Sequence, residues 1–296
     1  MGSEMKLKKL FLLLVTAGAT FSALGGESEI NFTSGSNTIT GTLTLPDNVK
    51  NPPAVLILHG FTGERNGEKT PYFREGYLRY ASQQWAEDGI ASLRIDFMGS
   101  GDSSGDFADT TLESQIEEVK EALKYLSNSG QVNRRKISLL GHSQGGIVAS
   151  AVAASPPFPL SSVILWNPGI NPPAAYAAIF GEKVFNEGLS KGNQVYVARR
   201  REDNFVIPLR GNFFESLYRI TPAAEISRYK GPLLLAIGLQ DAYVTPQPAS
   251  AKALLKYHPG YHELWSRNVD HSFDISKTDK SYKELLDDTA RFIRAH

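Results

Sequence analysis

Apolar and polar residues alternate near the start of the chain. Ile30 and Phe32, followed by the segment ITGTLTL at residues 39–45, place apolar side chains at every second position, and Pro46-Asp47-Asn48 comes next. Alternation of this kind is typical of half-buried β-strands, and a cluster of turn-forming residues ends them. The pattern predicts an antiparallel hairpin at the beginning of the fold.

From residue 54 onward the apolar positions form continuous runs. Strands that are apolar on both faces belong to parallel sheets covered by helices on both sides. The runs lie at residues 54–58, 91–95, 137–140, 162–166 and 233–237, with a further strand expected at 262–265. Segments of helical periodicity lie between or after them, at residues 77–87, 112–126, 143–154, 249–257 and 282–294. This alternation predicts an α/β fold with a mostly parallel, doubly wound sheet.

One connection is too long for a simple crossover. About 65 residues separate the strand at 162–166 from the strand at 233–237, where a helix and two short loops would be enough. We predict a cap inserted at residues 171–226, within a single domain that spans residues 27–296. Aromatic side chains in this segment are suited to roofing a pocket at the carboxyl edge of the sheet. The run Arg199-Arg200-Arg201 is typical of a solvated face.

The N-terminal segment has the pattern of a bacterial secretory signal peptide. Basic residues within 6–9 precede a short apolar run at 10–19, and small residues follow. We expect residues 1–26 to be removed, with residues 1–4 interpreted as additions ahead of a natural start at Met5. The mature protein is then secreted or periplasmic and free of the membrane. The alternative is an uncleaved anchor, although the run is short for a membrane span.

Composition narrows the possible partners. The 31 Lys and Arg residues balance the 31 Asp and Glu residues, so nothing indicates nucleic acid or an anionic membrane surface as a partner. The chain has no cysteine, which excludes disulfides, thiolate catalysis and cysteine metal sites. We expect a monomer or homodimer that needs no metal or organic cofactor, and the balanced charge means that the substrate need not be charged.

The pentapeptide Gly141-His142-Ser143-Gln144-Gly145 carries the strongest chemical signal. It follows the apolar run at 137–140 and precedes a helix-compatible stretch of small residues. In a strand–turn–helix of this kind the central serine is held in strained backbone geometry with its hydroxyl exposed, and the glycines let helix and strand approach closely. The motif therefore predicts a nucleophile elbow at Ser143.

A serine nucleophile needs a histidine base and a carboxylate that orients the base. In folds with this elbow, the acid and then the histidine follow the serine in the chain, each in a loop after a later strand. Asp241 follows the strand at 233–237, and His271 follows the strand at 262–265. We predict Ser143, Asp241 and His271 as the catalytic triad.

Other titratable residues near strand ends are alternatives. Asp270 is the second candidate for the acid, although a residue adjacent to His271 in sequence would normally point away from its ring. His59 lies near the site but precedes the serine in the chain. Asp96 and Asp102 are interpreted as loop structure, because Asp102-Ser103-Ser104-Gly105 has the composition of a turn.

Backbone N–H groups should stabilise the oxyanion of the tetrahedral intermediate. We expect one donor at Gln144, at the start of the helix after the nucleophile, where the helix dipole favours negative charge. The second is expected at Phe61, within the glycine-containing loop at residues 59–63. Candidates for the substrate pocket are His142, Trp166, Tyr176, Phe213, Phe214 and Tyr243.

These motifs together resemble the α/β-hydrolase superfamily over nearly the whole mature chain. The resemblance rests on HGFTG at 59–63, DFMGSGDS at 96–103, GHSQGG at 141–146, the segment 238–241 and DHSF at 270–273. Within the superfamily, the first and third motifs and the position of the insertion are similar to those of the cinnamoyl or feruloyl esterases of gut and rumen bacteria. This likeness implies a serine carboxylesterase that acts on a small-molecule or saccharide-linked ester and releases hydroxycinnamate from plant cell-wall sugars.

The insertion departs from that subfamily. Its members grip a phenolic ring, but residues 171–178 contain no acidic residue, and Phe213-Phe214 stands where a tyrosine would be expected. Acyl specificity therefore stays open. The same triad could serve a short-chain aryl esterase, a thioesterase or a peptidase-like enzyme, because selection lies in the insertion. A non-catalytic binding protein with the same fold is a further alternative.

Overall fold

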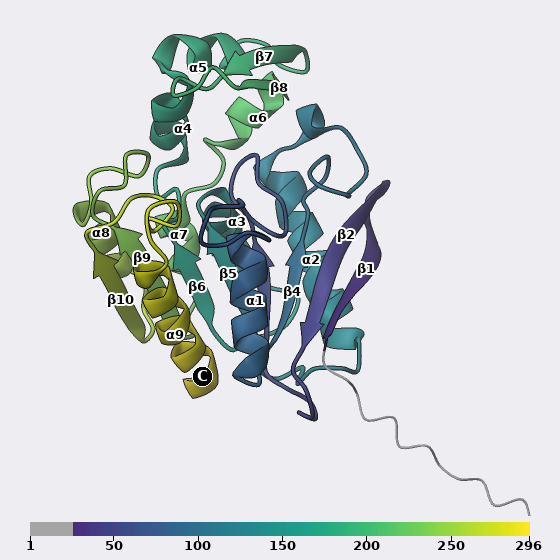
Figure 1. Ribbon diagram of the computed structural model, residues 1–296. Helices are drawn as coiled ribbons and strands as arrows, with labels where there is room; N and C mark the ends of the chain where they lie inside the picture. The colour runs from purple at the N-terminus through teal and green to yellow at the C-terminus, as the bar shows by residue number, and fades with distance from the viewer. Residues whose placement is uncertain (1–25) are drawn as a thin grey trace, which may run out of the picture.

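An eight-stranded sheet forms the centre of the molecule (Figure 1). The structure is a computed structural model that describes residues 26–296. The strand order is β1-β2-β4-β3-β5-β6-β9-β10. The strands are β1 (Gly26–Ser34), β2 (Asn37–Leu45), β3 (Ala54–Leu58), β4 (Ala91–Ile95), β5 (Ile137–His142), β6 (Val163–Trp166), β9 (Leu233–Gly238) and β10 (His262–Arg267).

The pairing of the strands follows their hydrophobic patterns. The alternating strands β1 and β2 form the antiparallel hairpin that the sequence predicts, and β2 pairs antiparallel with β4. The remaining neighbours are parallel. The strands β3, β4, β5, β6 and β9 are buried along their whole length, as expected for strands covered on both faces. β4 departs from a purely apolar run, because it also buries Ser92 and Arg94. The mostly parallel α/β fold is confirmed.

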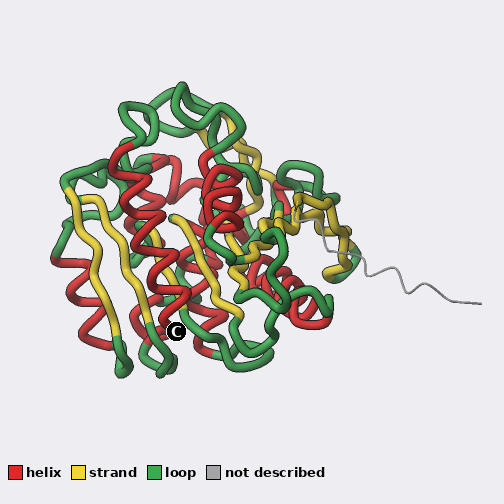
Figure 2. The backbone as a smooth tube through the Cα atoms, turned by 60° about the horizontal axis from the view of Figure 1, so that its bottom comes forward, coloured by secondary structure: helices red, strands yellow, loops and turns green. Residues whose placement is uncertain are grey.

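Helices cover the sheet on both sides (Figure 2). On one side lie α1 (Tyr77–Glu87) and α9 (Lys280–Ala295), which are joined by a hydrogen bond from the Trp85 indole N–H to the Leu286 carbonyl oxygen, 3.2 Å. On the other side lie α2 (Leu112–Asn128), α3 (Gln144–Ala154) and α8 (Ala249–Tyr257), and a short 3₁₀ helix, η1 (Phe107–Asp109), precedes α2. The amphipathic helices α1, α2 and α9 turn an apolar stripe toward the sheet, whereas α3 is buried on nearly all sides. The core is divided into two layers, one on each face of the sheet.

The inserted segment stands over the carboxyl ends of the parallel strands (Figure 1). It contains α4 (Pro172–Phe180), α5 (Glu182–Leu189), the antiparallel pair β7 (Val195–Arg199) and β8 (Val206–Arg210), and α6 (Gly211–Ser216). These elements are called the cap below, and the rest of the described chain is called the body. The last helix of the predicted insertion, α7 (Pro222–Ile226), instead packs against α3 and α8. The cap in the structure is thus shorter than the predicted 171–226 segment.

The expected signal peptide falls almost entirely outside the described residues, which begin with Gly26 as the first residue of β1. Among residues 26–296, no helix has both the length and the apolar character needed to cross a membrane.

Candidate active site

The turn between β5 and α3 forces Ser143 into an unusual backbone conformation. Its φ is 54° and its ψ is −113°, a region that costs a residue with a side chain roughly 1–3 kcal/mol. The flanking positions require glycine, because a side chain at either one would collide with nearby backbone atoms. A Cβ atom at Gly141 would lie 2.1 Å from the Gly145 carbonyl oxygen, and one at Gly145 would lie 2.6 Å from the Leu58 carbonyl oxygen. The structure thus has the strained strand–turn–helix geometry that the motif predicts.

The three predicted triad residues lie within hydrogen-bond distance of one another. The Ser143 Oγ is 2.9 Å from the His271 Nε2, and the His271 Nδ1 is 2.6 Å from the Asp241 Oδ2. The other carboxylate oxygen of Asp241 accepts hydrogen bonds from the backbone N–H groups of Tyr243, 2.8 Å, and Val244, 2.9 Å. Because the Asp241 side chain is fully buried and its acceptors are occupied, it can hold the imidazole in one orientation.

His271 is also held through its backbone. Its carbonyl oxygen accepts hydrogen bonds from the Asn167 Nδ2, 2.8 Å, and from the His142 Nε2, 3.2 Å. The Tyr77 hydroxyl donates to the His142 Nδ1, 2.8 Å. Burial, with a smaller contribution from the charge of His271, lowers the pKa of His142 to about 3, so its ring is neutral and carries its proton on Nε2.

The loop after β3 has a fixed peptide orientation next to Ser143. The Gly60 carbonyl oxygen accepts hydrogen bonds from the Gly63 N–H, 3.1 Å, and from the His59 Nδ1, 2.8 Å. In a trans peptide the N–H points opposite to the preceding C=O, so these bonds also fix the direction of the Phe61 N–H. A Cβ atom at Gly60 would lie 3.1 Å from the Ser143 Cβ, which explains the glycine at this close approach.

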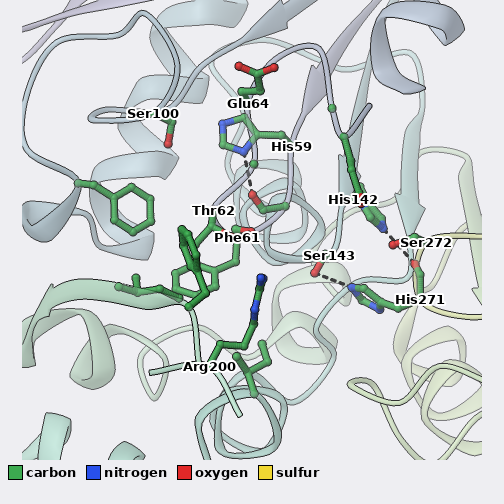
Figure 3. A pocket seen from close by; sticks show the side chains of 18 of the residues that line it. His59, Phe61, Thr62, Glu64, Ser100, His142, Ser143, Arg200, His271 and Ser272 are labelled. Carbon is green, nitrogen blue, oxygen red and sulfur yellow. Dashed lines mark hydrogen bonds between the residues drawn. The ribbon is translucent and has the colours of Figure 1, made fainter. Parts of the chain in front are cut away.

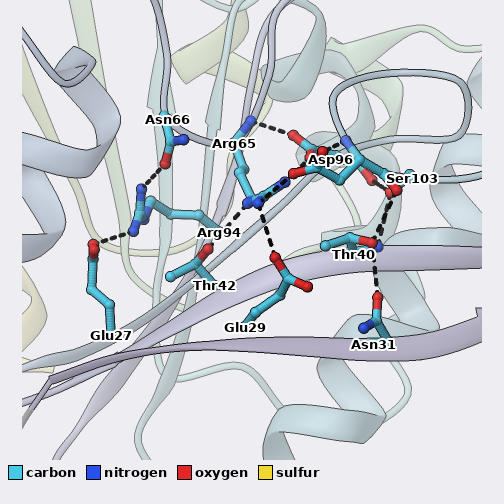
Figure 4. Close-up of polar contacts among 11 residues, drawn as sticks. Glu27, Glu29, Asn31, Thr40, Thr42, Arg65, Asn66, Arg94, Asp96 and Ser103 are labelled. Atoms are coloured by element: carbon cyan, nitrogen blue, oxygen red, sulfur yellow. Dashed lines mark hydrogen bonds and ion pairs between the residues drawn. The ribbon is translucent and has the colours of Figure 1, made fainter.

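A buried ion pair anchors the end of the same loop (Figure 4). The carboxylate of Asp96 accepts hydrogen bonds from the Arg65 backbone N–H, 2.6 Å, and the Asp102 N–H, 3.0 Å, and it pairs with the Arg65 guanidinium. The guanidinium also contacts the Asp102 carboxylate at 2.6 Å. Asp96 and Asp102 therefore join the loops after β3 and β4, in agreement with their interpretation as loop structure.

Asp270 has a different set of partners from Asp241. Its carboxylate accepts hydrogen bonds from the backbone N–H groups of Ser272, 3.0 Å, and Asp274, 2.9 Å, and it pairs with Lys277 at 2.9 Å. These contacts stabilise the turn after β10. The geometry favours Asp241 as the partner of the histidine.

A cavity of about 1090 Å³ opens beside Ser143 (Figure 3). Body residues of the loops after β3, β4 and β5 form one part of its wall, and the β7–β8 hairpin of the cap forms another. Its aromatic lining consists of Phe61, Tyr77, Phe107, Phe205 and Tyr243, and its charged lining includes Glu64, Lys69, Arg200, Glu202 and Asp203. Within residues 26–296, no cluster of three or more His, Asp or Glu side chains could hold a metal ion.

A family model described as serine aminopeptidase, S33, matches residues 53–266, which contain the elbow and Asp241. The chain belongs to this S33 family. Its members are hydrolases with the α/β-hydrolase fold, as the resemblance seen in the sequence implied. Comparison with curated protein sequences gave no match.

Solved structures share the fold of this S33-family chain at low sequence identity. Est1E from Butyrivibrio proteoclasticus, with bound ferulic acid, aligns with a TM-score of 0.73 and 23% identity, over 90% of this chain and 100% of that one. The α/β hydrolase GrgF from Penicillium sp. sh18 aligns with a TM-score of 0.72 and 16% identity, over 92% and 99%. The Pyrococcus furiosus esterase Pf2001 aligns with a TM-score of 0.65 and 19% identity, over 92% and 93%.

The pocket predictions for this S33-family chain were wrong at four positions. His142 and Tyr243 line the cavity, but Trp166, Tyr176, Phe213 and Phe214 do not. Trp166 is fully buried among aromatic rings of the body core, and Phe214 is fully buried inside the cap. Tyr176 and Phe213 pack their rings on Phe61, one layer behind the cavity wall.

Three residues of the S33 site were missed by the sequence analysis. Asn167 and Tyr77 support the histidine loop, and Arg200 lines the cavity although its arginine run was expected to be a solvated face. A signal was available for Asn167, which directly follows β6 at the edge of the sheet where the other site residues lie. For Tyr77 and Arg200 no local pattern distinguishes the functional position from an ordinary surface or core position.

Proposed function

We propose that this protein is a serine carboxylesterase that works through an acyl-enzyme intermediate. The observation that carries the proposal is the continuous hydrogen-bond chain from the Ser143 Oγ through the His271 imidazole to the buried Asp241 carboxylate, at the wall of a large cavity. A serine on a strained elbow, next to an oriented imidazole, has the arrangement that acyl transfer requires.

In the proposed reaction, the Ser143 Oγ attacks the carbonyl carbon of the ester while the His271 Nε2 takes the hydroxyl proton. Asp241 stabilises the imidazolium that forms. As the tetrahedral intermediate collapses, His271 gives the proton to the departing alkoxide and the alcohol leaves. A water molecule, deprotonated by the same histidine, then attacks the acyl-enzyme and releases the carboxylic acid.

The backbone N–H groups of Phe61 and Gln144 are proposed to bind the oxyanion. Gln144 is the first residue of α3, where N–H groups have no acceptor within the helix and the helix dipole favours negative charge. The Gly60–Phe61 peptide is held by the two bonds to the Gly60 carbonyl oxygen. Donors that are already oriented act without reorganisation during the reaction, and one such donor contributes about 2.7–4 kcal/mol.

An aromatic acyl group, such as feruloyl, is the proposed substrate class, linked to a saccharide alcohol. The aromatic rings of the cavity wall, Phe61, Phe107, Phe205 and Tyr243, support a planar apolar group, and the charged residues support a polar alcohol. The fold shared with Est1E, whose structure contains ferulic acid, is consistent with this class.

A second candidate function is peptidase-like cleavage of an amide. The family description names an aminopeptidase, and the half-buried carboxylate of Glu64 lies in the cavity wall, where it could bind a substrate α-ammonium group. The same triad serves either leaving group, so the two functions differ in which substrate the cavity accepts.

We also propose that the protein is exported, supported by the basic and apolar pattern of residues 6–19. N-terminal sequencing of the protein recovered from the periplasm or medium tests this. Recovery only from the cytoplasm with an intact N-terminus contradicts it.

The main experiment compares wild type with Ser143→Ala on methyl ferulate, p-nitrophenyl acetate, an acyl-thioester and an aminoacyl p-nitroanilide. We expect Ser143→Ala to lower ester turnover by at least about three orders of magnitude, because the nucleophile is lost. Ser227→Ala, which changes an exposed serine remote from the cavity, should keep wild-type activity.

Each outcome of the panel decides between functions. Preference for methyl ferulate supports the aromatic esterase, and preference for the anilide supports the peptidase. Retained turnover in Ser143→Ala rejects the nucleophile assignment. If wild type turns over no substrate and a fluorophosphonate probe does not label it, the protein is a binding protein that keeps the fold.

A further inference from the structure

One cap residue, Tyr176 of α4, contacts both residues that are proposed to supply the oxyanion donors. Its hydroxyl donates a hydrogen bond to the Gln144 Oε1. Its ring meets the Phe61 ring edge-to-face, with centroids 5.1 Å apart and an interplanar angle of 76°. Tyr176 is only 2% exposed, so water does not compete with either contact. The cap and the catalytic edge of the body therefore meet at this side chain.

The bond from Tyr176 continues into the body through buried amides. The Gln144 Nε2 donates to the Gln115 Oε1, 2.7 Å, and the Gln115 Nε2 donates to the Thr110 Oγ1, 3.2 Å. The chain runs from α4 through the first residue of α3 to α2. Since burial raises the pKa of Tyr176 well above its ordinary value, its hydroxyl stays a donor. Because each amide is bonded at both its oxygen and its nitrogen, it has a single preferred orientation.

The Phe61 side chain packs mainly against aromatic rings of the cap. Phe213 stacks on its ring with centroids 5.4 Å apart and an interplanar angle of 19°, and Phe180 meets it at 5.9 Å. One body ring, Phe107, lies at 6.0 Å. Displacement of the cap would release this ring and the Gln144 side chain together.

We propose that Tyr176 is a positioning residue that couples the seating of the cap to the geometry of the oxyanion hole. This inference rests on the proposed function, because it assigns the Phe61 and Gln144 amides to the oxyanion. Donors that are displaced by a fraction of an ångström lose contact with the transition state while ground-state binding changes little. The cap then influences the chemical step even for substrates too small to touch it.

The test compares Tyr176→Phe with Tyr196→Phe on p-nitrophenyl acetate. Both variants remove a hydroxyl hydrogen bond in the cap, but the Tyr196 hydroxyl donates to Glu187, 2.7 Å, away from the oxyanion loop. We expect Tyr176→Phe to lower kcat about tenfold with KM unchanged, since one buried acceptor loses its partner. Tyr196→Phe should stay within about twofold of wild type, because a partly exposed hydrogen bond contributes less. Affinity for methyl trifluoromethyl ketone (1,1,1-trifluoroacetone), a transition-state analogue of acetyl transfer, should fall in parallel with kcat.

Two measurements separate positioning from general loss of structure. Gln144→Met removes the acceptor of the same bond, so the double variant Tyr176→Phe/Gln144→Met should lose no more kcat than the larger single loss. Melting temperatures of the variants show whether any has lost its fold. Equal kcat in Tyr176→Phe and Tyr196→Phe, a loss confined to KM, or additive losses in the double variant would overturn the proposal.

Failure of the proposed function gives a different result. If wild type hydrolyses no ester, amide hydrogen exchange can still measure the coupling between the cap and the loops that carry the proposed oxyanion donors. The rates to compare are those of the Gly63 and Gly146 N–H groups, which donate to the Gly60 and Ser143 carbonyl oxygens. Tyr176→Phe should accelerate exchange at both amides relative to Tyr196→Phe. Unchanged exchange rejects the coupling, whatever reaction the site performs.

Discussion

The body and the cap hold their contributions to the cavity in different ways. In the body, the Asp241 carboxylate accepts two backbone hydrogen bonds besides the bond to His271, and the His271 carbonyl accepts two side-chain bonds. In the cap, the β7–β8 hairpin brings Arg200 and Phe205 to the cavity with the Phe205 side chain half exposed. The groups proposed to cleave the ester are thus fixed at the edge of the sheet, and the groups proposed to recognise the substrate lie on the β7–β8 hairpin.

This difference has a physical cause. Acyl transfer needs a few atoms held to within a fraction of an ångström, and the carboxyl ends of buried parallel strands supply that rigidity. Recognition of a substrate group tolerates more variation, because apolar contact is not directional. The comparison therefore predicts that body variants affect every substrate, whereas variants of the hairpin affect only substrates large enough to reach it.

The largest effect is expected for Asp241→Asn. An amide in place of the carboxylate favours the wrong imidazole tautomer and removes the charge that stabilises the imidazolium, so kcat should fall about 10⁴-fold on every ester of the panel. Steady-state kinetics of the purified variant measure this. Asp270→Asn is the matched control, because that carboxylate bonds the turn after β10 instead. A larger loss in Asp270→Asn than in Asp241→Asn would reassign the acid.

A smaller effect, on stability alone, is expected for Glu118→Gln. Burial raises the pKa of Glu118 on α2 from 4.5 to about 7, only partly offset by a hydrogen bond from the Met98 N–H, 2.9 Å. The folded state therefore binds this proton more tightly than the unfolded state does. Its contribution to stability is present below about pH 4.5 and is lost as the pH rises through 7, by up to about 3 kcal/mol.

Urea unfolding at pH 5 and pH 8 tests the Glu118 prediction. Glu118→Gln, which can still accept from Met98, should be more stable than wild type at pH 8 and similar at pH 5, with unchanged substrate preference. Glu117→Gln is the control, since Glu117 is exposed and pairs with Lys120. The prediction fails if both variants show the same pH dependence.

The smallest effect is expected for Phe205→Ala on the hairpin. Loss of apolar contact in the cavity should lower kcat/KM for methyl ferulate about fivefold and leave p-nitrophenyl acetate unchanged. Parallel kinetics on the two esters give the ratio. Val197→Ala, an exposed change on the same hairpin at a position that does not line the cavity, should alter neither value. Equal losses on both esters would contradict the separation of cleavage from recognition.

Much of the body could be predicted from the sequence because its signals are local. Buried strands such as β3 and β9 are continuous apolar runs, and a strained elbow needs its glycines. Chain order then places Asp241 and His271 after later strands, and the structure brings both to Ser143.

The lining of the cavity could not be predicted in the same way. An aromatic ring is stabilised equally by a cavity wall, a protein core or a neighbouring ring, so composition does not separate Tyr243, which lines the cavity, from Phe213, which packs behind it. The position of Arg200 depends on how the hairpin is seated on the body. Tertiary packing decides both which aromatic rings line the cavity and where Arg200 lies, and the sequence carries no periodic signal for such packing.

The cap is one uninterrupted stretch of chain that leaves the body after β6 and returns to it before α7. A single recombination could therefore replace it whole while keeping Ser143, Asp241 and His271 in place. The bond between Tyr176 and Gln144 limits that exchange, since a transplanted cap must bring a donor for the same amide. A new cap, in this lineage or in a laboratory chimera, would therefore be selected both for its fit to a substrate and for a side chain that donates a hydrogen bond to Gln144.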